Sequence, residues 1–263
     1  MSNNEGQYLH KLALIGGEGN LMRYSEFLKQ QGMYEQMHLW LEAGVERGYR
    51  EAMYMLGNCY YAAIGTEENI DRAFLLYEQA AAKQHPDALN NLADMYLNGE
   101  SVEVDEQKAL QLFTKAANLG VCEAMFTLGM MYEQGIGVEQ NDELAFKYYE
   151  QSAKKGDIEA QNRVATIYFE GLCNKQTNVA QAIYWYKQAA AQGHVDAQYS
   201  LGYIYSEGLA GKVSTKDALY YFECAANQGD IDAAKKLVVL YEKLKLKEEA
   251  RFWQLEIEDW FEQ

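Results

Sequence analysis

Proline is almost absent from this sequence of 263 residues, which contains Pro86 alone. A proline inside a helix removes a hydrogen bond and clashes with the preceding turn, so a chain with one proline can be helical throughout. Long apolar runs are also missing, since no stretch reaches the roughly 20 residues that a helix needs to cross a bilayer. The first basic residue is Lys11 and the nearby apolar run is only LALI, which does not fit a secretory signal. We therefore expect a soluble, cytoplasmic and mostly helical protein.

Motifs that carry chemistry are missing as well. The sequence has no glycine-rich phosphate loop, no HExxH zinc motif and no GxSxG nucleophile motif. No CxxC pair is formed by the cysteines, which are Cys59, Cys122, Cys173 and Cys224. Reduced structural thiols are therefore expected, in place of a zinc site. We predict no cofactor, no metal ion and no catalytic residue.

Basic residues are in the minority, because 23 Lys and Arg stand against 39 Asp and Glu, for a formal net charge of −16. Phosphate backbones and anionic lipids both need a basic surface, so we expect no nucleic acid and no membrane among the partners. A negative surface keeps a protein soluble and also attracts a basic partner, and both interpretations stay open. The excess of acidic over basic side chains is greatest in residues 51–122, which carry 4 basic and 11 acidic ones.

What the sequence does contain is a repeat of about 36 residues. An acidic residue followed by alanine begins each unit, at residues 51, 87, 123, 159, 196 and 232. Each unit holds two segments in which apolar residues recur at helical spacing. In one of them Ala197, Leu201, Gly202 and Tyr205 share a face. We expect alanine and glycine on this face to let two helices approach closely, with a neighbouring aromatic ring filling the remaining space.

Signals for helix ends recur with the same period. A glycine stands three residues before the acidic residue in most units, at Gly48, Gly120, Gly156, Gly193 and Gly229. A glycine there can end a helix in the left-handed conformation. Gln84 takes this position once, and Pro86 then marks the helix start. The repeated acids lie at helix starts, so we interpret them as caps that complement the helix dipole. His85 and His194 fall in the same turns, where we expect exposed polar loops.

The strings AMYMLGNCY and AQYSLGYIY, the loop YEQGIGV and the string AFKYYEQSAKKG resemble the Sel-one-like repeat family, a relative of the tetratricopeptide repeats. The resemblance covers about residues 51–250. It implies an all-α fold, an α/α superhelical solenoid of antiparallel helix pairs whose first helices line a concave side. The tyrosine of the first helix is then interpreted as scaffold wherever it recurs, at Tyr60, Tyr96, Tyr132, Tyr168, Tyr205 and Tyr241.

We predict three parts along the chain. Residues 1–50 form N-terminal capping helices and a partial repeat, residues 51–231 form five repeats, and residues 232–263 form a C-terminal partial repeat and a capping helix. The five repeats are expected at 51–86, 87–122, 123–158, 159–195 and 196–231. In the last helix, Trp253, Trp260 and Phe261 are predicted to cover the end of the stack. The alternative is that they form an exposed docking or dimer patch.

First-helix positions that change from repeat to repeat are the candidates for binding, because packing does not fix them. Fifteen of them are predicted to line the concave groove: Tyr54, Asn58, Tyr61, Asn90, Asp94, Asn98, Phe126, Met130, Glu133, Asn162, Thr166, Glu170, Tyr199, Tyr203 and Glu207. Aromatic rings give anchor area, and amides can satisfy an extended backbone. Alternatively, several of the rings only fill gaps between helices. An acidic rim is also predicted, made of Glu67, Glu68, Asp71, Glu100, Glu103, Asp105 and Glu106.

These features predict a non-catalytic adaptor or scaffold that binds a protein or peptide, and the acidic rim favours a basic partner. A specific alternative is a cytoplasmic immunity or antitoxin protein that inhibits a basic toxin, such as a secreted effector nuclease. A third alternative, an unrecognised hydrolase, requires a titratable cluster with shifted pKa values in a pocket.

Overall fold

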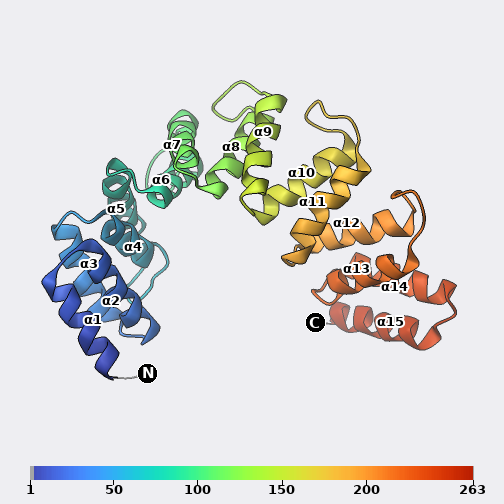
Figure 1. Cartoon of the computed structure of the whole chain (residues 1–263), viewed down its shortest axis with the longest axis horizontal. Coiled ribbons are helices and arrows are strands. Elements are labelled where there is room, and N and C mark those ends of the chain that lie inside the picture. The colour runs from blue at the N-terminus through green and yellow to red at the C-terminus, as the bar shows by residue number, and fades with distance from the viewer. Residues whose placement is uncertain (1–2, 263) are drawn as a thin grey trace. The chain divides into compact units, whose positions relative to one another are not determined.

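The computed structural model describes residues 3–262, with side chains described for residues 6–260, and this range forms fifteen α-helices and no β-strand (Figure 1). The predicted all-α fold class is therefore confirmed. The chain divides into two compact units, Met1–Gln140 and Asn141–Gln263. Unit 1 contains α1 (Asn3–Ile15), α2 (Glu18–Gln30), α3 (Tyr34–Glu46), α4 (Arg50–Tyr61), α5 (Ile70–Ala82), α6 (Pro86–Asn98), α7 (Glu106–Asn118) and α8 (Cys122–Gln134). Unit 2 contains α9 (Asp142–Lys154), α10 (Ile158–Glu170), α11 (Val179–Ala191), α12 (Val195–Ser206), α13 (Thr215–Ala226), α14 (Ile231–Lys243) and α15 (Lys247–Glu262).

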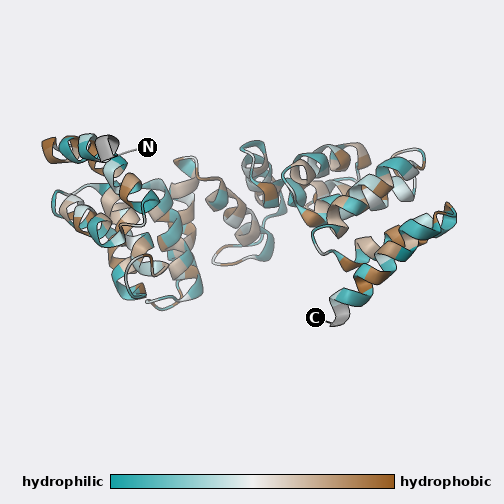
Figure 2. Ribbon diagram, turned by 90° about the horizontal axis from the view of Figure 1, so that it is seen from below, coloured by the Kyte–Doolittle hydropathy of each residue, from teal (hydrophilic) through white to brown (hydrophobic). Residues whose placement is uncertain are grey.

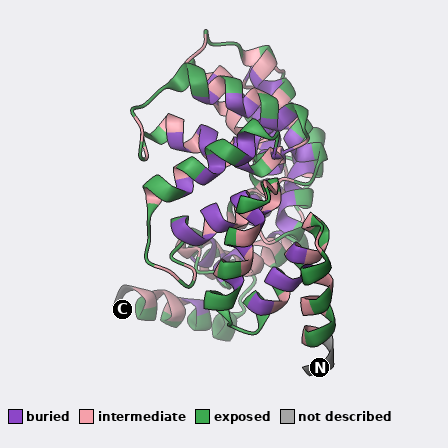
Figure 3. Cartoon of the chain, turned by 90° about the vertical axis from the view of Figure 1, so that its left-hand side faces the viewer, coloured by how far each residue is buried: buried purple, intermediate pink, exposed green. Residues whose placement is uncertain are grey.

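Within each unit, a helix packs against the helices that precede and follow it in the chain, as in an α/α repeat solenoid. We call the first helix of each pair an A helix and the second a B helix. The A helices are α4, α6 and α8 in unit 1 and α10, α12 and α14 in unit 2. Apolar and polar residues alternate along the helices (Figure 2), and the helices carry both buried and exposed residues (Figure 3). Each helix therefore contributes an apolar stripe to a shared core.

Close contacts between A and B helices depend on small residues. A Cβ atom added to Gly57 would lie 2.7 Å from the Tyr77 ring, and one added to Gly202 would lie 2.6 Å from the Phe222 ring. Both aromatic side chains are buried. The predicted role of these glycines, close approach with a ring filling the remaining space, is confirmed at both positions.

The turns between repeats share one backbone conformation. The five glycines predicted to end helices have positive φ values, from 77° at Gly48 to 102° at Gly120 and Gly156. Gln84, the exception in the sequence, adopts the same conformation with a φ of 60°. The packing of neighbouring helices therefore imposes this turn even where no glycine favours it.

The residues that cap the A helices differ from the prediction. The repeated acids lie in the first turns, but the capping hydrogen bond comes from the side chain two positions earlier, at His85, Asp157, His194 and Asp230. The expectation of exposed loops at the histidines is wrong. The His85 side chain is only 3% exposed, and its ring stacks on Tyr54 at a centroid distance of 4.4 Å. The turn buries the imidazole because its ring nitrogen replaces a missing acceptor for a backbone N–H.

Each loop between an A helix and its B helix in unit 1 touches the preceding B helix. The Ile64 carbonyl lies 2.8 Å from Nε2 of His38 in α3, and the Ser101 hydroxyl donates to Asp71 in α5. In the third repeat, the Gly137 N–H donates to the Glu106 carboxylate at 2.9 Å. These contacts connect each repeat to its predecessor in unit 1.

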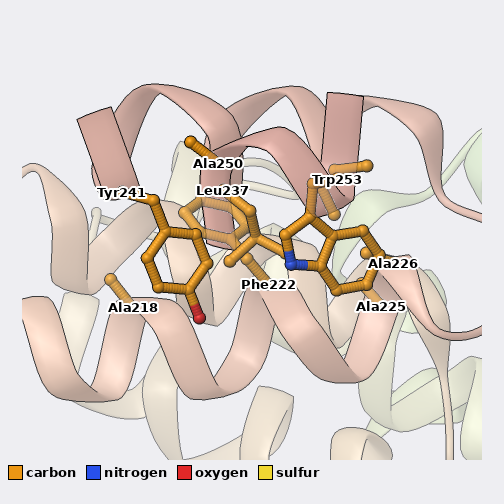
Figure 4. Packing of buried hydrophobic residues seen from close by; sticks show 10 residues of the cluster. Ala218, Phe222, Ala225, Ala226, Leu237, Tyr241, Ala250 and Trp253 are labelled. Atoms are coloured by element: carbon orange, nitrogen blue, oxygen red, sulfur yellow. The ribbon is translucent and has the colours of Figure 1, made fainter. Parts of the chain in front are cut away.

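The C-terminal end of unit 2 is covered by α15 (Figure 4). Trp253 is 6% exposed and packs in a cluster with Phe222, Leu237 and Tyr241, and Trp260 is half-buried against that cluster. Trp253 therefore belongs to the core, and the exposed patch considered as an alternative does not include it. The side chain of Phe261 lies outside the described residues.

Candidate functional site

The fifteen predicted groove residues lie on A helices or, for Glu207, at a helix C-terminus, and none of them is buried. Unit 1 contains nine of them and unit 2 contains six. The exposed ones are Tyr61, Asn98, Glu170, Tyr203 and Glu207. The half-buried ones are Tyr54, Asn58, Asn90, Asp94, Phe126, Met130, Glu133, Asn162, Thr166 and Tyr199. By contrast, the alanine and leucine residues that recur on these helices, such as Ala88 and Leu92, are buried.

In unit 1, residues of α4, α5, α6 and the loop after α6 line an open cavity of about 230 Å³ that brings together several of these residues. We call it the Asp94 cavity, and it is lined by Tyr61, Tyr77, Asn91, Asp94, Met95, Asn98 and Glu100. Three of these side chains were predicted as groove residues, and Glu100 was predicted as part of the acidic rim. Tyr77, Asn91 and Met95, which also line the cavity, were not predicted as site residues. The signal for Tyr77 was present, since an aromatic recurs at its position, but it pointed to packing.

Hydrogen bonds fix the polar walls of the Asp94 cavity. Asn90 Nδ2 donates to Asp94 Oδ2 at 3.1 Å, and the Tyr61 hydroxyl donates to Glu100 Oε2 at 3.0 Å. The two carboxylates are thereby held by neutral donors. Each keeps a second oxygen that these bonds do not use.

Asn58 orients the inner side of the same cavity. Its Oδ1 accepts a hydrogen bond from the Tyr77 hydroxyl at 2.7 Å and a long one from Asn91 Nδ2 at 3.5 Å. Because the amide nitrogen of Asn91 is directed at Asn58, its carbonyl oxygen remains as an acceptor. Asn58, predicted to bind a partner directly, therefore positions cavity residues without lining the cavity itself.

Two ionisable groups that line the Asp94 cavity, Asp94 and Tyr61, have raised pKa values. Burial raises the pKa of Asp94 from 3.8 to about 6, and the charge of Glu100 adds to the effect. The hydrogen bond to Glu100 raises the pKa of Tyr61, and burial and nearby carboxylates act in the same direction. The helix α6 contains no Lys or Arg. Among the described residues, neither Asp94 nor Glu100 forms an ion pair with a basic side chain.

Other predicted residues of unit 1 lie apart from the cavity lining. Tyr54 stacks on His85 and lies 6.2 Å from the ring of Tyr77, which makes it a packing residue as much as a surface one. Phe126, Met130 and Glu133 lie on α8 and do not line the cavity.

In unit 2, three of the six predicted side chains contact other residues of the chain. The Thr166 hydroxyl lies 3.1 Å from the Tyr186 hydroxyl, and Tyr199 packs edge-to-face on Phe222 at 5.6 Å. The ammonium group of Lys236 lies 5.9 Å from the centre of the Tyr203 ring. Glu170 and Glu207 are exposed, and Asn162 is half-buried.

Several acids of the predicted rim have local structural partners. Asp105 caps α7 by accepting the Lys108 N–H at 2.8 Å. Asp71, Glu100 and Glu106 accept the bonds from Ser101, Tyr61 and Gly137 described above. Glu67, Glu68 and Glu103 are exposed, and Glu103 borders an open hollow of the loop before α7. At least four of the seven acids therefore stabilise loops or helix starts.

The described residues include no group of three or more His, Cys, Asp and Glu side chains placed to hold a metal ion. None of the four cysteines, which all lie in the described range, forms a disulfide. In the same range, every helix is too short or too polar to span a bilayer.

Comparison with known proteins identifies the repeat. The Sel1 repeat family model matches residues 50–85, 86–121, 122–157, 158–194 and 195–230. A Sel1 repeat protein from Oxalobacter formigenes is 26% identical, with a TM-score of 0.80 over 90% of this chain and 98% of that one. No curated protein matches the sequence.

A second solved structure is a protective antigen present in uropathogenic Escherichia coli strains, which displays an SLR fold. It is 28% identical, with a TM-score of 0.56 over 97% of this chain, and this chain spans 64% of its length. An immunity protein from Pseudomonas aeruginosa is 23% identical, with a TM-score of 0.47 over 79% of this chain and 81% of that one. The matched repeats cover more than half of the sequence. The chain belongs to the Sel1 repeat family.

Proposed function

We propose that this chain is a non-catalytic interaction module that binds a protein or peptide partner through its A helices, and in unit 1 through the Asp94 cavity. The Sel1 repeat fold itself suggests a protein-interaction scaffold. The single observation that carries the proposal is that the A helices bury their recurring residues and leave non-recurring residues accessible. Recurring side chains such as Leu92 are buried, whereas non-recurring ones such as Tyr61 and Asn98 remain accessible. Side chains that packing leaves accessible are available for a partner.

The chemistry of the accessible residues fits a polypeptide. Tyr61, 42% exposed, offers a flat ring with a hydroxyl at its edge. Asn91 and Asn98 offer amide groups that can hydrogen-bond to a backbone or to a polar side chain. Aromatic anchors beside amides are common at protein interfaces.

The test is quantitative binding to a partner captured from the native cytosol and then purified. The variant Tyr61→Ala/Asn98→Ala changes the A-helix surface, and Leu75→Ala/Gln111→Ala changes exposed positions on the B helices α5 and α7. We expect the first variant to lose about tenfold or more in affinity and the second to bind like the wild type. Equal affinities for both, with unchanged circular dichroism, would show that the A-helix surface is not the binding site.

A second candidate function is inhibition of a basic toxin, in the manner of an immunity or antitoxin protein. The observation that favours it is the pair of carboxylates, Asp94 and Glu100, that no basic side chain neutralises among the described residues. An inhibitor should capture one tight partner whose association rate falls steeply with salt. A general adaptor should bind several partners reversibly, with little dependence on salt.

A hydrolase stands last among the candidates. Asp94 meets one requirement, because its pKa is raised and it lines a cavity. The lining contains no histidine, cysteine, serine or lysine, so Glu100 is the other acidic side chain available as a base or nucleophile. The Tyr61 hydroxyl donates to that carboxylate at 3.0 Å. Turnover that disappears in Asp94→Asn would replace the binding proposal with an enzymatic one.

A further inference from the structure

We infer that the Asp94 cavity accepts an arginine side chain of the partner. The inference rests on the proposed function, protein binding through the A helices, and adds the chemistry of the group that is bound. It follows from four features: an open cavity, unneutralised carboxylates, aromatic walls, and the residues that occupy the equivalent position in unit 2.

The cavity has the walls that an arginine requires. The rings of Tyr61 and Tyr77 and the thioether of Met95 provide apolar surface for the three methylene groups of the stem. The carboxylates of Asp94 and Glu100 and the amide oxygens of Asn91 and Asn98 provide acceptors. A guanidinium group has five N–H donors in one plane and no acceptor, so an acceptor-rich cavity matches it.

The charges in the cavity are not balanced by the chain itself. Asp94 and Glu100 have hydrogen bonds from neutral groups, Asn90 Nδ2 and the Tyr61 hydroxyl. Since α6 has no Lys or Arg, that helix supplies no countercharge. A partially buried carboxylate without a countercharge is costly to keep ionised, and an entering cation removes that cost.

In unit 2, an arginine of the chain itself lies beside the tyrosine that corresponds to Tyr77. Tyr149 and Arg163 are the counterparts of Tyr77 and Asn91, each displaced by two repeat lengths, or 72 residues. The Arg163 guanidinium carbon lies 5.9 Å from the centre of the Tyr149 ring. Burial raises the pKa of Tyr186, the charge of Glu170 adds to this rise, and the charge of Arg163 opposes it. In unit 1 the residue at this position is the neutral Asn91, and the acidic Asp94 stands where unit 2 has Thr166. A guanidinium beside the Tyr77 ring would therefore be supplied by the partner.

Arginine fits this cavity better than other cations. The described residues provide no group of three acidic, histidine or cysteine ligands for a metal ion. A lysine ammonium is a compact, strongly hydrated charge, whereas a guanidinium is weakly hydrated and stacks on aromatic rings. The tyrosine walls therefore favour arginine over lysine.

Binding of a cation also predicts a proton linkage. The neutral form of Asp94 binds a guanidinium weakly, and its pKa is about 6 in the empty cavity. We therefore expect affinity to increase as the pH is raised from about 5 to about 7.

The experiment uses the full chain and three peptides of the form acetyl-Gly-Ser-Xaa-Ser-Gly-amide, in which Xaa is arginine, lysine or citrulline. Citrulline has nearly the shape of arginine and no charge. Binding is followed by NMR through the side-chain amide signals of Asn91 and Asn98. The site variant is Asp94→Asn, and the matched control is Asp87→Asn, an exposed carboxylate in the first turn of the same helix.

We expect saturable shifts of both amide signals with the arginine peptide and affinities about tenfold or more lower for lysine and citrulline. Asp94→Asn should lose binding to a similar extent, and Asp87→Asn should keep it. The inference is overturned if the arginine peptide does not bind, if citrulline or lysine binds as tightly, or if Asp94→Asn binds normally. Such a result leaves the proposed function standing when Tyr61→Ala/Asn98→Ala still loses the natural partner. Intact peptide binding with no effect of that variant on the partner would instead overturn the proposed function.

Discussion

The imidazole of His85 connects two successive repeats. Its Nε2 lies 2.9 Å from the Glu51 carboxylate in the first turn of α4, and its Nδ1 accepts the Ala88 N–H at the start of α6. The pair His194 and Glu159 in unit 2 has the same arrangement at 3.3 Å. Because Nδ1 accepts a backbone N–H, the ring proton is on Nε2, where it is donated to the carboxylate. One side chain therefore both caps a helix and contacts the preceding repeat.

Replacement of His85 by alanine should lower the free energy of unfolding by about 1 to 2 kcal/mol, because it removes the cap and the contact to Glu51. The measurement is urea unfolding followed by circular dichroism. His85→Asn retains an acceptor for the backbone N–H and should lose clearly less. Equal losses in the two variants would show that the cap contributes nothing.

Asp94→Asn should raise the free energy of unfolding at pH 7 by on the order of 1 kcal/mol, allowing for partial exposure of the group. The folded-state pKa of Asp94 is raised to about 6 from 3.8, so the folded protein holds this proton more tightly than the unfolded chain. The ionised carboxylate therefore lowers stability above about pH 6, and this penalty disappears below about pH 4.

Urea unfolding at several pH values measures the difference between Asp94→Asn and the wild type, with Asp87→Asn as the exposed control. The increase in the free energy of unfolding caused by Asp94→Asn should vanish below about pH 4, and Asp87→Asn should show no comparable increase. A variant that is more stable and yet loses the arginine peptide would identify Asp94 as a residue kept for binding at the expense of stability. A destabilised Asp94→Asn would contradict this interpretation.

Gly202→Ala should destabilise unit 2 by about 1 to 3 kcal/mol, because its new methyl group would lie 2.6 Å from the Phe222 ring. Gly19 in α2 is the matched control, since no atom other than its chain neighbours and the nearby backbone of its own helix lies within 4 Å of an added Cβ there. We expect the urea midpoint of Gly19→Ala to equal that of the wild type or to be slightly higher. A neutral Gly202→Ala would mean that the two helices separate without cost.

Trp253→Ala should cost about 3 to 5 kcal/mol, since it opens a cavity in the cluster with Phe222 and Leu237. Its neighbour Phe252 is 53% exposed and provides the control, because its truncation removes little buried surface. Thermal unfolding followed by circular dichroism compares the two variants. Similar melting curves for both would indicate that α15 does not cover the end of unit 2.

The recurring residues made the fold predictable from sequence, because alanine, glycine and aromatic positions repeat where helices touch. Gly202 and Phe222 illustrate this, since their contact follows from spacing alone. Trp253 lies in the core at the end of unit 2, as the predicted cap requires, whereas His85 was misplaced in an exposed loop. Whether a polar or aromatic side chain near a chain turn is buried depends on the neighbouring helix, and a linear pattern contains no information on that neighbour.

The site was predictable in part for the same reason. Non-recurrence identified Tyr61, Asp94 and Asn98, but not Asn91 or Met95, which line the same cavity. The rotation of a helix about its axis decides which of two adjacent residues faces a cavity. The 3.6-residue period does not fix this rotation closely enough to choose between neighbouring residues. Asp94 also showed no sign of its raised pKa in the sequence, because burial by other residues causes it.

The bond between Gly137 and Glu106 has an evolutionary consequence. The loop of the third repeat is anchored on the helix α7 of the second by a backbone N–H and a carboxylate. The loops of the two earlier repeats also contact the preceding B helix, but one pairs a carbonyl with an imidazole and the other a hydroxyl with a carboxylate. Each loop is therefore matched to the B helix of its own predecessor, and not to every repeat alike. A change in the order or number of these repeats would alter the loop contacts as well as the core, so recombination between repeats meets a second requirement besides the recurring packing residues.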